Sequence, residues 1–280
     1  MEKRATGKLY LVATPIGNLE DITFRAINVL KEADIIAAED TRHTLKLLNH
    51  YEISKPLISY HRHNEDVKKE VLINKLLEGQ NIALVTDAGT PGISDPGEEI
   101  VREAIENNIE IIPIPGACAL INALIPSGLN TKEFAFYGFL PLNKNNRKSV
   151  LERIKKEDKT VILYEAPHKL IKTLEDIQTS VGDINCVLAR ELTKIHEEFI
   201  RGSINSILEK MKEKEAIKGE YIVLLDLNNN VIEGDDIKNK TIEEQYKIYE
   251  SQGMEKKDII KQIAKNKNVA KNEIYKLFVN

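Results

Sequence analysis

The stretch IALVTDAGTPGISDPG at residues 82–97 decides the fold class, because it joins an apolar run to a loop suited to close backbone contact. IALV is typical of a strand buried on both faces, as in parallel sheets covered by helices. Residues 86–97 hold three glycines and two prolines, which allow close approach of a ligand and stiffen the loop. Open α/β sheets bind ligands at such strand ends. The loop matches neither G-x-G-x-x-G nor a Walker loop, so the usual dinucleotide and phosphate-binding patterns are absent.

The segments around this stretch alternate between short apolar runs and runs of helical periodicity. The apolar runs predict further strands at 9–13, 34–38, 57–60 and 109–114. Helices are expected between them, at 21–33, 64–79 and 98–107. The apolar residues at helical spacing are Phe24, Ile27, Val29 and Leu30 in the first helix and Val67, Val71, Leu72, Leu76 and Leu77 on one face of the second. This order predicts an α/β fold with a parallel sheet covered on both faces.

A turn-rich stretch at 127–141 separates this pattern from a second one, and it is a plausible domain junction. Beyond it, strands are expected at 134–138, 161–164, 186–189 and 221–227, with a helix at 170–180. EEFIRGS at 197–203 adds an extended segment before a further helix. Late strands with few helices between them predict a mixed sheet.

The C-terminal part has a different composition. Residues 229–240 are polar and aperiodic, as in a linker, and 241–280 predict three short helices. Their apolar stripes comprise Ile259, Ile260, Ile263 and Ala264, then Ile274, Leu277 and Phe278. The turn between the stripes is expected to bury Val269 and has helix-turn-helix spacing. Because 253–280 carry a net charge of +4, both nucleic-acid contact and a plain bundle with solvated lysines remain open. The expected organisation is therefore 1–127 and 128–228 as two α/β domains, 229–240 as a linker and 241–280 as a helical tail.

Composition sets further bounds. The 280 residues carry a net charge of −4, which argues against a protein coated with basic charge for nucleic acid but allows a local basic patch. The two cysteines, Cys118 and Cys186, lie far apart and the six histidines are scattered, so neither a zinc site nor a disulfide framework is predicted. We expect no metal site and a reducing, cytoplasmic setting. No apolar run approaches the ~20 residues of a membrane span, and the first is too short for a signal peptide.

Several other segments carry chemistry-bearing residues. ATPIGNLED at 13–21 and PIPGACA at 113–119 follow predicted strands, although each alone is as typical of an ordinary turn. The polar clusters are AEDTRHT at 38–44, SYHRHNE at 59–65, YEAPHK at 164–169 and ARELTKIHEE at 189–198. Each alone is typical of a solvated loop or a structural ion pair. Three of them follow predicted strand ends, so they are expected to converge on one rim.

In this order and at these intervals, the motifs resemble the tetrapyrrole methylase superfamily, and within it the branch that methylates ribosomal RNA. The match covers about residues 8–227, and the tail resembles the helix-turn-helix-like tail of that branch. The resemblance implies a two-domain fold with S-adenosyl-L-methionine in the cleft between the domains, and a homodimer. It further implies 2′-O-ribose methylation of a cytidine in the decoding region of 16S ribosomal RNA, within the small ribosomal subunit and away from any membrane.

The resemblance also assigns cofactor positions, residue by residue. They are Pro15, Asp87, Gly89, Thr90, Gly92, Ile93, Cys118, Ala119, Tyr164, Ala189 and Gly219. The superfamily's usual acid after the first loop glycine is replaced here by Thr90, and Asp87 or Asp95 could compensate for it. Lys169 stands where arginine is commoner, which keeps the charge but loses the planar fork.

A hypothesis for the acceptor side follows from the polar clusters. The residues expected to line it are Glu39, Arg42, Glu165, His168, Glu191 and Lys194. A ribose hydroxyl is a poor nucleophile at neutral pH, so Glu191 or Glu165 would accept its proton. Lys194 and Arg42 would hold phosphate or stabilise the developing alkoxide.

Two other functions remain open. A methyltransferase of the same fold could act on a small tetrapyrrole, but its acceptor pocket should be larger and more apolar than this charged rim. A non-catalytic nucleic-acid-binding regulator could use the helical tail alone. That regulator has no reason to keep the glycine-rich and proline-rich loop, and it would bind no cofactor.

Overall fold

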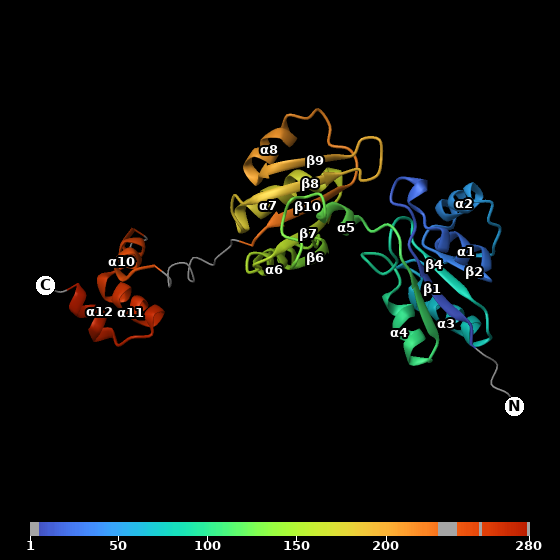
Figure 1. The fold of residues 1–280 in the computed structure, drawn as a ribbon, viewed down its shortest axis with the longest axis horizontal. Coiled ribbons are helices and arrows are strands. Elements are labelled where there is room, and N and C mark those ends of the chain that lie inside the picture. Colours follow the sequence, from blue (N-terminus) through green and yellow to red (C-terminus); the bar gives the residue numbers. More distant parts are fainter. Residues whose placement is uncertain (1–5, 229–239, 252–253, 279–280) are drawn as a thin grey trace.

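The computed structural model describes residues 6–228, 240–251 and 254–278. Two five-stranded sheets follow one another along the chain, and a group of short helices follows them (Figure 1). The predicted α/β class with C-terminal helices is confirmed.

The first sheet is parallel throughout, with strand order β3-β2-β4-β1-β5. Its strands are β1 (Lys8–Val12), β2 (Ile35–Ala38), β3 (Leu57–Ser59), β4 (Ile82–Val85) and β5 (Glu110–Ile114). Its helices are α1 (Phe24–Glu32), α2 (Thr41–His50), α3 (Glu65–Leu77) and α4 (Glu98–Glu106). One core lies between the sheet and α3 and α4, and the other lies on the α1 and α2 side. The predicted coverage of both faces is confirmed, and it places the carboxyl ends of all five strands at one edge.

Two helices of this half depart from the sequence-based expectation. In α3 the buried residues are Leu72, Ile73 and Leu76, whereas Val67 is 70% exposed. At about 100° per residue, Val67 lies almost opposite that buried face, so its assignment to the core was wrong. The expected stripe of α1 likewise fails at Phe24, which is 88% exposed. The helix α2 was not predicted at all, because it buries little apolar surface.

The second sheet is mixed, as predicted, with strand order β6-β7-β10-β8-β9. Its strands are β6 (Phe134–Phe139), β7 (Thr160–Glu165), β8 (Asn185–Arg190), β9 (Glu198–Ser203) and β10 (Tyr221–Asp226). Strand β10 runs antiparallel to both β7 and β8, so its first residue, Tyr221, pairs with Glu165 and Arg190 at their final positions. The start of β10 therefore lies at the same edge as the ends of β7 and β8.

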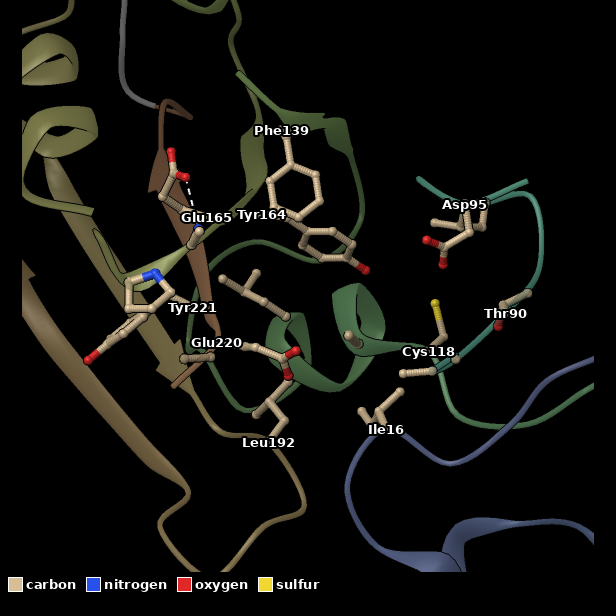
Figure 2. Close-up of a pocket in the computed structure, with 18 of the residues that line it drawn as sticks. Ile16, Thr90, Asp95, Cys118, Phe139, Tyr164, Glu165, Leu192, Glu220 and Tyr221 are labelled. Atoms are coloured by element: carbon tan, nitrogen blue, oxygen red, sulfur yellow. Dashed lines mark hydrogen bonds between the residues drawn. The ribbon is translucent and has the colours of Figure 1, made fainter. Parts of the chain in front are cut away.

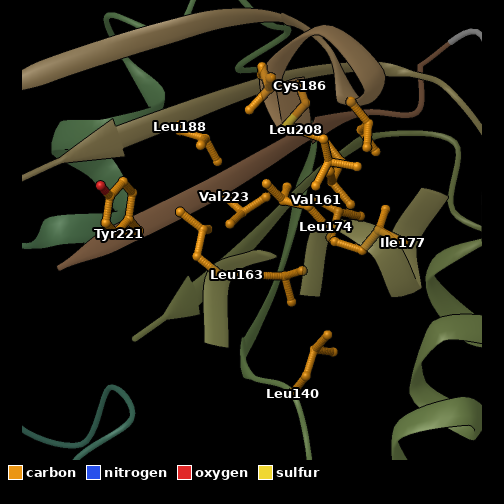
Figure 3. Packing of buried hydrophobic residues seen from close by; sticks show 14 of the residues in the cluster. Leu140, Val161, Leu163, Leu174, Ile177, Cys186, Leu188, Leu208, Tyr221 and Val223 are labelled. Atoms are coloured by element: carbon orange, nitrogen blue, oxygen red, sulfur yellow. The ribbon is translucent and has the colours of Figure 1, made fainter. Parts of the chain in front are cut away.

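Helices cover both faces of the second sheet. On one face are α6 (Lys144–Ile154), α7 (Leu170–Ser180) and α8 (Ile204–Lys212), and Figure 3 shows the apolar cluster packed there. The short helix α5 (Ala119–Leu124) packs on the other face through Leu120, Ala123 and Leu124. The predicted domain bounds place α5 in the first domain, but its buried face joins the second sheet. The boundary at 127 itself stays a prediction.

The C-terminal helices are α10 (Ile242–Ser251), α11 (Lys256–Lys267) and α12 (Lys271–Leu277). They share a small core that contains Ile259, Ile263 and Ile274, as the two predicted stripes require. Two details were wrong, because Val269 is 38% exposed in the turn and Leu277 is 59% exposed. The predicted linker, except its last residue, lies outside the described residues. Among the described helices, none is long and apolar enough to cross a membrane.

Candidate functional site

A cavity of about 440 Å³ lies between the two sheets (Figure 2). We call it the main cavity. Its first wall consists of loops that follow β1, β4 and β5, with residues such as Ile16, Gly89 and Cys118. Its second wall consists of the ends of β7 and β8 and the start of β10, with residues such as Tyr164 and Ile222. The volume is in the range typical of small-molecule sites.

The first wall is held together by its backbone. Thr14 and Gly89 exchange two backbone hydrogen bonds, with N···O distances of 2.9 and 3.1 Å. The Thr90 hydroxyl donates to the carbonyl of Ala117 at 3.1 Å, which ties the β4 loop to the β5 loop. Gly89 has φ +84°, and a Cβ there would lie 3.3 Å from Cγ2 of Ile16. A ligand in the main cavity can therefore contact bare backbone at Gly89.

The structure sorts the eleven predicted cofactor residues into three groups. Those that line the main cavity are Gly89, Thr90, Ile93, Cys118, Ala119, Tyr164 and Ala189. Pro15 and Asp87 line a second, smaller cavity instead. Gly92 and Gly219 line neither of these cavities. A Cβ at Gly219 would lie 2.5 Å from Cγ of Glu191, so this glycine makes room for a neighbouring side chain.

Tyr164 is the central aromatic side chain of the second wall. Its hydroxyl accepts a hydrogen bond of 3.1 Å from the backbone N–H of Leu120, at the start of α5. Its ring meets Phe136 and Phe139 edge-on, at centroid distances of 4.9 and 5.7 Å. Burial, helped by the nearby Cys118, raises the pKa of Tyr164, so the phenol is neutral at physiological pH.

Glu165 and His168 both line the main cavity. The Glu165 side chain is tethered, because it accepts a hydrogen bond of 2.8 Å from the N–H of Ala166 and another from the Thr173 hydroxyl. Arg147 in turn donates to the Thr173 hydroxyl at 2.7 Å. Glu165 is only 5% exposed, so these contacts hold the turn that leads into His168.

Glu191 and Lys194 are brought together in a loop at the rim, but neither lines the main cavity. Lys194 Nζ lies 3.0 Å from Glu191 Oε1 and 3.0 Å from Glu220 Oε2. The backbone N–H of Glu220 donates to Glu191 Oε1 at 2.9 Å. That N–H and the nearby Lys194 lower the pKa of Glu191. Through Glu220, which does line the cavity, this ion-pair network reaches the site.

Glu39 and Arg42 lie apart from the other predicted catalytic residues. Glu39 Oε2 accepts a long hydrogen bond, 3.4 Å, from the N–H of Asp87. Burial and the Asp87 carboxylate raise the pKa of Glu39. The Arg42 side chain is 89% exposed and pairs with Asp40 at 2.8 Å. The six residues expected on one acceptor side therefore occupy three separate places.

The second cavity, of about 270 Å³, lies between the loop after β1 and helix α2. Pro15 and Gly17 line it, whereas Ile16 between them lines the main cavity. From α2, His43 and Lys46 contribute basic side chains. The segment from Thr14 to Gly17 thus forms part of a wall with one cavity on each side.

Sequence reasoning missed several residues of the two cavities. They are Phe139, Leu192, Glu220, Tyr221 and Ile222 in the main cavity, and His43 and Lys46 in the second. Glu220 and Tyr221 stand at the beginning of a strand, where no binding residue was sought. Residues 41–50 carry an amphipathic pattern that buries Thr44 and Leu48, and this pattern was the available signal for α2. Within the described residues, no group of His, Cys, Asp and Glu side chains is arranged to hold a metal ion.

Comparisons with known proteins place this geometry in a family. Residues 8–208 match the family described as Tetrapyrrole (Corrin/Porphyrin) Methylases. Among curated proteins, the ribosomal RNA small subunit methyltransferase I of Halalkalibacterium halodurans is 48% identical over 274 residues, 97% of this chain and 94% of that protein. The protein of the same name from Bacillus subtilis is 46% identical and covers 98% of this chain and 94% of its own length.

Solved structures show the same fold at low sequence identity. A diphthine synthase superposes with a TM-score of 0.62 at 16% identity, covering 78% of this chain and 90% of that one. A uroporphyrin-III C-methyl transferase from Thermus thermophilus, complexed with S-adenyl homocysteine, gives 0.56 at 15% identity, covering 79% and 98%. The predicted two-sheet fold and the predicted family are both confirmed. The chain belongs to the tetrapyrrole methylase family and, within it, to the group of the ribosomal RNA small subunit methyltransferases I.

Proposed function

We propose that the protein methylates the ribose 2′-oxygen of a cytidine in the decoding region of 16S ribosomal RNA, with S-adenosyl-L-methionine as the donor. The observation that carries the proposal is the contrast in charge between the two cavities. Asp95, Glu165 and Glu220 line the main cavity, and among the described residues no lysine or arginine does. The second cavity instead presents His43 and Lys46, with a single acid, Asp87, among its described lining residues.

The main cavity suits a cationic methyl donor. Its lining is mostly apolar, it contains carboxylates, and Gly89 exposes backbone to a bound molecule. The residues that would hold the cofactor are Gly89, Thr90, Ile93, Cys118, Ala119, Tyr164 and Ala189. When bound, the donor supplies a methyl group whose bond to the positive sulfonium breaks as a bond to the acceptor oxygen forms, leaving a neutral thioether. The protein's main contribution is to position both reactants, which can supply up to roughly 7–11 kcal/mol of the barrier.

The second cavity suits an anionic acceptor. Exposed Arg42, His43 and Lys46 lie on α2, and RNA-binding proteins use such side chains for phosphate contacts. Arg42 is partly neutralised by Asp40, so we assign the larger share of phosphate attraction to Lys46. The net positive tail adds a further contact to RNA.

Proton transfer from the ribose hydroxyl needs a nearby base. Glu191 and Glu165 remain the proposed acceptors, acting directly or through water, with Lys194 and Arg42 favouring the developing alkoxide. Alanine variants of Glu39, Arg42, Glu165, His168, Glu191 and Lys194, made one at a time, test the assignment. We expect at least one to lose more than about tenfold in kcat, equivalent to about 1.4 kcal/mol. A loss of less than about tenfold in kcat in all six variants would refute the assignment of these residues to the acceptor side.

The decisive experiment offers the enzyme its acceptor directly. Small ribosomal subunits that lack the modification are incubated with donor labelled on the methyl group, and the nucleosides are then separated. We expect label in 2′-O-methylcytidine. Label in uroporphyrinogen, offered in a parallel reaction, would instead support the tetrapyrrole alternative, although a polycarboxylate would be repelled by this acid-lined cavity. Tight donor binding without label in either acceptor would refute both.

The tail and the oligomeric state have separate tests. Deleting 241–280 should weaken RNA binding and flatten its salt dependence while leaving donor affinity unchanged. Equal RNA affinity in the shortened protein would refute the tail's role. The proposal also includes a homodimer in the cytoplasm, as the family resemblance implies. Sedimentation at monomer mass at working concentration would exclude it.

A further inference from the structure

Asp95 differs from the other acids that line the main cavity. It comes from the loop after β4, and Figure 2 shows its carboxylate, the Tyr164 hydroxyl and the Cys118 thiol pointing into the same part of the cavity. Glu165 and Glu220 lie on the opposite wall of the same cavity (Figure 2). Asp95 therefore faces whatever occupies the space between the two sheets.

The other two carboxylates already have partners. Glu165 accepts from the N–H of Ala166 and from the Thr173 hydroxyl, and Glu220 pairs with Lys194. Asp95 has no such donor, since no side chain or backbone N–H in the described part of the chain donates a hydrogen bond to its carboxylate. A half-buried carboxylate without a donor is unfavourable, and a ligand that brings positive charge removes that penalty.

The nearby carboxylates make the electrostatic potential at Asp95 more negative. Glu39 at the end of β2 and Asp87 after β4 both repel its charged form. Arg62, after β3, offsets them in part, and its guanidinium donates to the carbonyl of Ser94. On the cavity side the titratable neighbours are Tyr164, neutral at physiological pH, and Cys118. Burial and these carboxylates together raise the pKa of Asp95 to about 6.

We propose that Asp95 distinguishes the methyl donor from the demethylated product by charge, so that the main cavity prefers the donor and releases the product. This inference rests on the proposed function. S-adenosyl-L-methionine carries a sulfonium, whereas S-adenosylhomocysteine has an uncharged sulfur at the same position. The two ligands otherwise share their adenosine and amino-acid groups, so a carboxylate that faces the sulfur gives a preference that apolar contacts cannot.

The test compares the Kd values of the two ligands by calorimetry. The probes are S-adenosyl-L-methionine, S-adenosylhomocysteine and sinefungin, whose ammonium group replaces the sulfonium. In Asp95→Asn, we expect the two cationic ligands to bind roughly tenfold more weakly, because a half-buried carboxylate attracts positive charge through partial solvent screening. The uncharged-sulfur ligand should change less than about twofold. Equal weakening of all three ligands would mean either that Asp95 contacts the amino-acid group they share or that its role is structural, and either result would overturn the proposal, as would no weakening.

Two control variants show whether the change in the Kd ratio comes from the charge of Asp95. Glu98→Gln removes a nearby carboxylate that lies outside the cavity and pairs with Arg102, so the ratio of the two Kd values should stay at the wild-type value. Asp95→Glu, which keeps the charge, should restore most of the preference for the donor. A lost preference in Asp95→Glu with intact folding, judged by the melting temperature, would contradict a charge effect.

The pH dependence gives an independent reading. Between pH 7 and pH 5 the ligands' own charges are nearly constant, but Asp95 takes up a proton. The wild-type preference for donor over product should therefore fall as the pH drops through about 6, whereas Asp95→Asn should show no such step. A step of equal size in both proteins would assign it to another group and overturn the proposal.

Failure of this inference is distinguishable from failure of the proposed function. If the wild-type protein binds no S-adenosyl-L-methionine, the proposed function itself fails. If it binds the donor and labels cytidine, but the ratio of the Kd values for donor and product does not change in Asp95→Asn, only the charge discrimination fails.

Discussion

The two walls of the main cavity hold their shape by different means. The first wall consists of loops after parallel strands, where backbone bonds such as the Thr14–Gly89 pair fix the surface and glycine exposes it. The second wall is made by side chains, with the Tyr164 ring against Phe136 and an ion-pair network behind Glu220. Substitutions should therefore affect ligand binding first on one wall and stability first on the other.

The largest expected effect lies on the second wall. Tyr164→Ala removes a ring packed against two aromatic neighbours, and we expect a loss of about 3–5 kcal/mol in the free energy of unfolding. Tyr164→Phe keeps the ring and loses only the acceptor for the Leu120 N–H, for a loss of about 1 kcal/mol. Urea unfolding of both variants measures the difference. Similar losses in the two would mean that the hydroxyl, and not the ring, holds this wall.

A substitution in the first wall should act on binding instead. Gly89→Val forces a β-branched residue into φ +84° and places its methyl groups between Ile16 and the cavity. We expect donor affinity to fall about a hundredfold, equivalent to about 2.7 kcal/mol. Gly92→Val is the matched control, because Gly92 has φ +81° in the same loop but nothing within 4 Å of its Cβ position. Both variants should lose similar stability, of about 1–3 kcal/mol, and comparable losses of affinity would contradict the assignment of Gly89 to the cavity.

The two walls also differ in how far the sequence predicts them. Glycine, proline and strand-end position indicated the loop that holds Gly89, and the family resemblance added Cys118 in the first wall. Pro15 lines the second cavity, whereas Ile16 lines the main one, because neighbouring residues of an extended segment point in opposite directions. Glu220 and Tyr221 were not predicted because they reach the main cavity only if β10 runs antiparallel to β7. The composition of a strand does not reveal its direction.

The predicted catalytic residues lie in three separate places for a related reason. A position at the end of a strand predicts that a side chain lies near the edge of the sheet. It does not predict which neighbouring residue the side chain will bond to. Arg42 turns outward to Asp40 two residues before it, and Glu165 turns to Thr173 eight residues later. Helical patterns fail similarly in α3, where only the neighbours in the fold decide which of two apolar faces is buried.

Asp95 should affect both ligand binding and stability. Its charge favours binding of a cationic ligand but lowers the free energy of unfolding. Its pKa in the folded protein, about 6, lies above the ordinary value of 3.8. The folded state thus holds the Asp95 proton more tightly, and the contribution of Asp95 to stability declines as the pH rises from about 4 to 6 and then stays level. Asp95→Asn should raise the free energy of unfolding by about 1 kcal/mol at pH 8, after allowance for solvent screening, and by almost nothing at pH 4. Thermal unfolding at both pH values measures this, and a gain at pH 4 as large as that at pH 8 would contradict it.

The smallest expected effect concerns the ion pairs at the rim of the second wall. Lys194→Met keeps the aliphatic stem that lies close to Gly17 and removes only the charge shared by Glu191 and Glu220. Because these pairs are partly exposed, we expect a loss of only about 0.5–1 kcal/mol at pH 7. The pKa of Glu191 is lowered in the folded protein, so its stabilisation is complete above the ordinary value of 4.5 and disappears as the pH falls through the folded value. The difference between Lys194→Met and wild type in urea unfolding should therefore stay constant from pH 7 to about pH 5 and narrow between pH 5 and pH 3. A difference that stays constant down to pH 3 would show that Lys194 acts through packing on the first wall, and the division between a backbone wall and a side-chain wall would then not hold at the rim.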